Sequence, residues 1–83
     1  MLAMNKSELY DIILGKASDG QTLVLTKDNI APGDGFLNLN TFPKVTVTFR
    51  MDTVPFRLEF DNDEPMRLDE LPTRFLETLV RNL

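Results

Sequence analysis

The clearest pattern along the chain is an alternation of apolar and polar residues between positions 45 and 60. Apolar residues occupy the odd positions from 45 to 51 and the even positions from 54 to 60, and most residues between them are polar or charged. A period of two is the pattern of a β-strand with one apolar face. The sequence therefore predicts two strands that form a hairpin with one apolar and one polar face.

The parity of these two runs limits how the strands can pair, because directly opposed residues share a face of the sheet. The numbers of paired residues must then sum to an odd number. A sum of 105 centres a two-residue turn between the strands, as a tight hairpin requires. On the polar face this register places Thr48 opposite Arg57 and Lys44 opposite Asp61.

Near the N-terminus, apolar residues recur at helical spacing between positions 9 and 17. Asn5 followed by Glu8 has the spacing of a capping box, in which two side chains satisfy the first backbone N–H groups of a helix. We therefore expect a helix over about 6–17. A short strand over 9–14 is the competing interpretation.

The C-terminal segment carries an apolar residue at every fourth position from Leu71 to Leu83. This spacing predicts an amphipathic helix that runs to the end of the chain. Asp69 has the residue type of an N-cap, and Pro72 is tolerated in a first helical turn. The polar stretch over 61–65 predicts a loop before this helix.

The remaining segments predict one further strand and a second, weaker one. Residues 21–26 are rich in apolar and β-branched types, which favour a strand. Pro32-Gly33 suits a type II turn and Asp34-Gly35 suits a tight hairpin turn. Residues 36–40 contain a short alternation that predicts a half-exposed strand. The expected fold is α+β, with a small antiparallel sheet of three to four strands and an N-terminal and a C-terminal helix packed on one face.

Composition narrows the functional classes. The 83 residues give room for one domain, and we take 1–83 as that domain. The chain has no cysteine and no histidine, which removes disulfides, thiolate zinc sites and the commonest general base and metal ligand. The lack of cysteine favours a cytoplasmic setting, and no apolar run reaches membrane-spanning length, so we expect no membrane association.

Clusters of carboxylates do not indicate a metal site or a catalytic pair. Counted as a calcium loop from Asp61, the chain has Pro65 at the fifth position, Met66 at the sixth and Pro72 at the twelfth, where calcium loops need other residues. Adjacent acids in a domain this small are more simply explained as solvated surface groups. We therefore expect no catalytic residues, no metal, no cofactor and no small-molecule ligand, and a protein that is not an enzyme.

The polar face of the hairpin is the best candidate for a binding surface, since helices on the apolar face would leave it open. Its candidate binding residues are Lys44, Thr46, Thr48, Arg50, Arg57 and Glu59. The sequence thus predicts a small non-enzymatic protein-interaction domain, such as an accessory or inhibitor protein, with a protein partner or a second copy as its ligand. The alternative is a nucleic-acid accessory protein that uses the same face. The net charge of −4 disfavours it, as do the aromatic residues, which are predicted on the other face.

Overall fold

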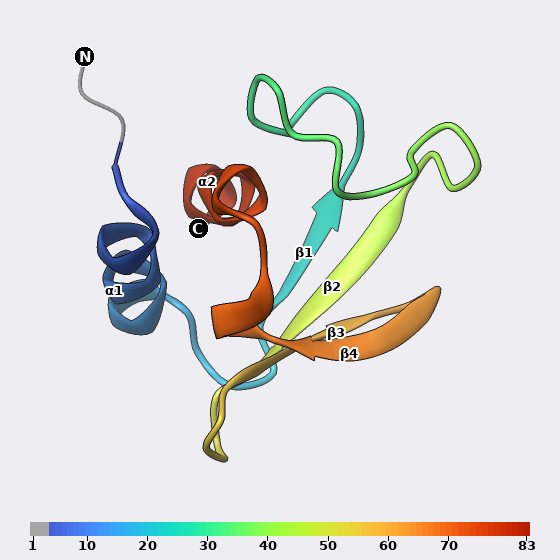
Figure 1. The fold of residues 1–83 in the computed structure, drawn as a ribbon. Helices are drawn as coiled ribbons and strands as arrows, with labels where there is room; N and C mark the ends of the chain where they lie inside the picture. The colour runs from blue at the N-terminus through green and yellow to red at the C-terminus, as the bar shows by residue number, and fades with distance from the viewer. Residues whose placement is uncertain (1–3) are drawn as a thin grey trace.

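The strands form one antiparallel sheet in the order β1-β2-β3-β4 (Figure 1) in the computed structural model, which describes residues 4–83. Both α-helices lie on the same side of this sheet, and α1 packs against α2. The elements are α1 (Lys6–Lys16), β1 (Thr22–Leu25), β2 (Val45–Arg50), β3 (Arg57–Phe60), β4 (Asp63–Arg67), a short 3-10 helix η1 (Leu68–Glu70) and α2 (Thr73–Asn82). The predicted α+β fold is confirmed, with its small antiparallel sheet and both helices on one face.

The hydrophobic core is one layer of side chains between the helices and the sheet. Each fully buried aliphatic or aromatic side chain contributes about 1.5–3 kcal/mol relative to an exposed one. The fully buried members of the core are Leu9, Ile13, Leu25, Val45, Val47, Phe49, Leu58, Leu68, Leu71, Phe75, Leu76 and Leu79.

The N-terminal segment is a helix, so the competing strand interpretation over 9–14 is wrong. The predicted capping box is present in full. The backbone N–H of Glu8 donates to Asn5 Oδ1 at 2.9 Å, and the backbone N–H of Asn5 donates to Glu8 Oε1 at 3.1 Å. Leu9 and Ile13, one helical turn apart, carry the buried side of α1.

The hairpin forms with the predicted faces, but its register differs from the prediction by two residues. Paired residue numbers sum to 107 instead of 105, so Arg50 lies opposite Arg57. Pro55 explains the shift, because it has no N–H to donate and the predicted register would place it in the ladder opposite Arg50. The observed register leaves Pro55 in a loop over 51–56.

The prediction of a loop over 61–65 is wrong, because β4 begins at Asp63 after a tight turn. The polar composition of this segment and Pro65 do not give the sequence pattern of a strand. The backbone N–H of Leu68 donates to Phe56 O at 3.0 Å, so alternate residues of β4 direct their backbone groups toward β3. Pro65 falls on the outward-facing set, where a missing N–H costs no ladder bond.

The C-terminal helix begins later than Asp69. Asp69 lies in η1, and Pro72 occupies the N-cap position of α2 without a capping side-chain hydrogen bond. The carboxylate of Asp69 binds Arg67 instead. The prediction of Asp69 as an N-cap is therefore wrong.

The long segment between β1 and β2 contains the predicted turn but not the predicted strand. Asp34 N donates to Ala31 O at 3.0 Å, and Gly33 has a φ of +80°, as the third residue of a type II turn requires. Residues 36–40 form no strand, and no hairpin turn forms at Asp34-Gly35. Phe36 and the buried Leu39 instead close one end of the core.

Thr78 joins this long segment to α2. Its side chain is fully buried, and its Oγ1 accepts the backbone N–H of Ala31 at 2.8 Å and donates to Asp34 Oδ2 at 2.6 Å. One turn later, Asn82 Nδ2 donates to the carbonyl of Asn29 at 2.9 Å. Two neighbouring helix positions therefore fix the loop against the core.

Replacing Thr78 by valine should lower the free energy of unfolding by about 1–3 kcal/mol, because the buried N–H of Ala31 would lose its acceptor. The change is nearly isosteric, so packing stays almost constant. Urea unfolding followed by circular dichroism measures the difference. The matched control is Thr22→Val at an exposed strand position, where the change should stay within about 0.5 kcal/mol. Equal losses in the two variants would contradict the role of the buried hydroxyl.

Candidate functional site

The face of the sheet opposite the helices is covered by no other element of residues 4–83 (Figure 1). Along β2 the side chains alternate between buried and less buried, and the less buried ones belong to this face. We call it the open face. Its members are Thr22 and Val24 of β1, Thr46, Thr48 and Arg50 of β2, Arg57 and Glu59 of β3, and Arg67 of β4.

The structure brings five of the six predicted binding residues together on the open face. Thr46, Thr48 and Arg50 follow one another along β2, and Arg57 and Glu59 lie beside them on β3. The register sets Thr48 opposite Glu59, so its predicted pairing with Arg57 is wrong.

Lys44 is the sixth predicted residue, and it precedes β2 as an exposed residue outside the ladder. Its predicted partner Asp61 lies opposite Thr46 instead, since Asp61 N donates to Thr46 O at 3.1 Å. The predicted opposition of Lys44 and Asp61 is therefore also wrong. The change of register shifts the β2 partner of every β3 residue by two positions.

The corrected register creates a row of three arginines across neighbouring strands. Arg50 of β2 lies opposite Arg57 of β3, and Arg57 lies opposite Arg67 of β4. We call these three residues the arginine row. With strands about 4.8 Å apart, the outer two positions are separated by about 10 Å.

The two outer arginines are each held by an acid. Arg50 Nε lies 2.9 Å from Glu59 Oε1. Arg67 makes two hydrogen bonds to the carboxylate of Asp69, at 3.0 and 2.6 Å. A hydrogen bond and the charge of Glu59 raise the pKa of Arg50, and a hydrogen bond and the charge of Asp69 raise the pKa of Arg67. Both of these guanidinium groups are therefore charged at neutral pH.

Sequence reasoning missed the contributions of β1 and β4 to the open face. Thr22 and Val24 could have been found from the strand predicted over 21–26, because its alternation sets them on one side. Arg67 could not be assigned without β4. The available signal was Asp61-Asn62, a pair of residue types that favour tight turns.

The edges of the sheet are weaker candidates for a binding surface than its open face. Pro65 and charged side chains occupy the outer side of β4, and such residues discourage pairing with another strand. On β1, Phe49 N donates to Gln21 O, which turns the backbone groups of Thr22 and Val24 outward. The Val24 carbonyl is already occupied by the side-chain amide of Asn29 at 2.8 Å.

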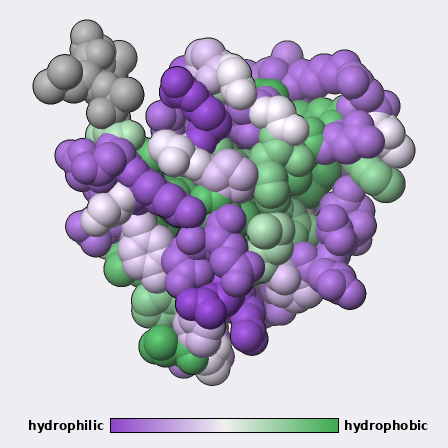
Figure 2. Space-filling view, viewed as in Figure 1, coloured by the Kyte–Doolittle hydropathy of each residue, from purple (hydrophilic) through white to green (hydrophobic). Residues whose placement is uncertain are grey.

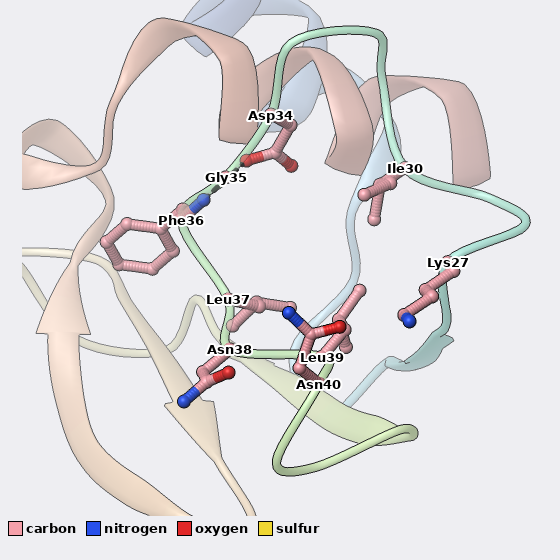
Figure 3. Close-up of a pocket in the computed structure, with 9 residues that line it drawn as sticks. All are labelled: Lys27, Ile30, Asp34, Gly35, Phe36, Leu37, Asn38, Leu39 and Asn40. Atoms are coloured by element: carbon pink, nitrogen blue, oxygen red, sulfur yellow. Dashed lines mark hydrogen bonds between the residues drawn. The ribbon is translucent and has the colours of Figure 1, made fainter.

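The long segment between β1 and β2 surrounds an open hollow of about 390 Å³. Figure 3 shows Lys27 and Asn40 turned toward its centre, and Phe36 and Asn38 turned away. In Figure 2, apolar side chains gather near the middle of the view with hydrophilic ones around them. One ammonium and one amide are too few polar groups to fix the orientation of a small ligand. The open face is therefore the stronger candidate site.

Within residues 4–83, no three metal-ligating side chains are placed to hold a metal ion. No helix in the same range is long and apolar enough to cross a membrane. No protein-family model, no curated protein and no solved structure matches this chain. The function must therefore be argued from the open face itself.

Replacing Arg57 by threonine should raise the free energy of unfolding by about 0.2–1 kcal/mol, because like charges directly opposite each other destabilise a sheet. The gain should shrink as salt is added, since salt screens exposed charges. Urea unfolding at low and high ionic strength measures both effects. Arg81→Thr, at an exposed position of α2, is the control and should lose a little stability through lower helix propensity. A clear loss of stability in Arg57→Thr would contradict the charge argument.

Proposed function

We propose that this chain is a small non-enzymatic protein-interaction domain that binds a protein partner through the open face. The observation that carries the proposal is the placement of both helices on one side of the sheet, which leaves the other side uncovered. The backbone of a sheet is rigid, so a partner that binds its face has little backbone to order. The lack of cysteine supports a reducing, cytoplasmic setting for this interaction.

The composition of the open face supports recognition of a protein surface. Short threonine side chains lie on β1 and β2, and longer charged side chains follow at the end of β2 and on β3 and β4. Val24 adds an apolar group that is 47% exposed. A partner could therefore contact the sheet closely and meet charged groups at the rim, as in many transient interfaces.

A nucleic-acid accessory role is the second candidate, and the arginine row is the observation that favours it. Two features oppose it. The chain carries 13 acidic against 9 basic residues, so long-range forces repel a polyanion. Phe49 and Phe60 pack in or against the core and offer no ring for base stacking.

Quantitative affinity capture from host lysate with mass spectrometry tests the proposal. Thr48→Lys should abolish capture of the specific partner, because it places a long side chain at the centre of the open face. The fold should tolerate this lysine, which would lie opposite Glu59. Ser7→Lys, at an exposed position of α1, adds the same charge elsewhere and should leave capture unchanged.

A partner captured equally by all three proteins would place binding on another surface and overturn the proposal. Light scattering on the same samples tests self-association. A dimer that Thr48→Lys dissociates and Ser7→Lys preserves would make a second copy the partner at this face. A monomer that captures no specific partner would count against the interaction function.

A further inference from the structure

Strand β1 forms one edge of the sheet, and its composition favours pairing with a further strand (Figure 1). Residues 21–26, which contain β1, include no charged residue, no proline and no glycine, and half of them are threonine or valine. Threonine and valine favour strands, and an exposed edge of this kind is a template for another chain. The opposite edge, β4, carries Pro65 and charged side chains, which discourage such pairing. The composition of β1 gives its edge none of that protection.

The side-chain amide of Asn29 occupies outward-facing backbone groups at the end of β1. The N–H of Thr26 donates to Asn29 Oδ1 at 2.8 Å, and Asn29 Nδ2 donates to the carbonyl of Val24 at 2.8 Å. These two backbone groups flank Leu25 on the side away from β2. A further strand would need both of them to continue the ladder past this point. One side chain of the same chain therefore binds the groups that an added strand would bind.

Backbone contacts hold Asn29 in this position. Its N–H donates to Thr26 O at 3.3 Å, and its carbonyl accepts Asn82 Nδ2 at 2.9 Å. Asn82 belongs to α2, so the helix that covers the core also fixes the residue that covers the edge. A strand from another molecule would have to displace two short hydrogen bonds and would also lose its translational freedom. The contact within the chain is therefore favoured over the added strand.

The part of the edge that Asn29 leaves open is very short. β1 has four residues, and Thr22 and Val24 direct their backbone groups outward. The carbonyl of Val24 is bound to Asn29, so the N–H of Val24 and the two groups of Thr22 are left. Strands in proteins usually pair over about three or more residues. Closure by Asn29 therefore leaves too little edge for stable pairing.

We propose that the Asn29 side chain closes the edge of β1 against strand addition, and that its removal lets β1 pair with β1 of a second copy. An uncharged strand meets no repulsion from its own copy, and two such edges can pair about a two-fold axis. Asn82 is a positioning residue, because it holds the carbonyl of Asn29. This inference is independent of the proposed function, which concerns the open face.

Sedimentation velocity of the full chain over a range of concentrations tests this proposal. Asn29→Ala removes both side-chain hydrogen bonds and should strengthen dimerisation by about tenfold or more, because an incoming strand no longer has to displace them. Asn40→Ala changes an exposed asparagine of the same long segment and should alter dimerisation by less than about twofold.

Two second substitutions in the Asn29→Ala chain locate the pairing at the edge. Val24→Pro removes an outward N–H that the ladder with β2 does not use, and it should restore the monomer. Val24→Thr changes the same side chain but keeps the N–H, so this chain should remain a dimer. Amide hydrogen exchange gives an independent measurement. In the unmodified chain Thr26 should exchange at least about tenfold more slowly than Val24, and in the Asn29→Ala dimer Val24 should gain protection.

Three results would overturn the proposal. The first is a folded Asn29→Ala chain that dimerises no more strongly than the unmodified one. The second is a dimer that Val24→Pro preserves, which would place the contact on another surface. The third is equal exchange of Thr26 and Val24 in the unmodified chain, a result that does not depend on the folding of any variant. If Asn29→Ala unfolds, Asn82→Ala, which frees the Asn29 carbonyl, replaces it, and an unchanged monomer would then count as the first result.

Discussion

Burial of the apolar side of α2 against one face of the sheet is the interaction on which the rest of the structure depends. The Phe75 ring lies 4.7 Å from that of Phe36 and 6.1 Å from that of Phe60, measured between ring centroids. The helix, the long loop and β3 therefore meet at one side chain. Such aromatic pairs add to the free energy of burial. With α1 beside α2 in the same layer, both helices cover one face and the other face stays open.

A domain of this size has a thin core, and the long segment between β1 and β2 helps to complete it. Ala31 and Leu39 are buried, and Phe36 covers one edge of the layer. Thr78 then ties the segment to α2 through a buried hydroxyl. These contacts give the segment a structural role. They also explain why its alternating apolar residues misled the prediction of a strand: they fill the end of the core instead of one side of a sheet.

The faces of the hairpin could be predicted because they depend only on parity. A shift of two residues leaves every side chain on its own face, so alternation cannot distinguish a sum of 105 from a sum of 107. The length of the loop distinguishes these two registers. Pro55 favours the longer loop, because it has no N–H to donate in the ladder. This is why five of the six candidate residues were predicted on one face while their cross-strand partners were wrong.

The arginine row lay beyond prediction for a related reason. It requires the correct register of β3 and the existence of β4, a strand in which Met66 is the only apolar residue other than Pro65. An edge strand with little buried surface gives no periodic signal, so neither condition could be read from the pattern. The arginine row can therefore be identified only from the backbone pairing of the three strands.

The position of Arg57 affects the stability of the sheet. A domain of this kind is stable by only a few kcal/mol, so even a small repulsion within the sheet is significant. The fold neutralises the two outer arginines with its own acids and leaves the central one without a partner among the described residues. An acid near Arg57 would have removed the repulsion within the chain, and would also have occupied the guanidinium. Within residues 4–83, Arg57 is thus the member of the row whose charge disfavours the sheet without forming an ion pair in return.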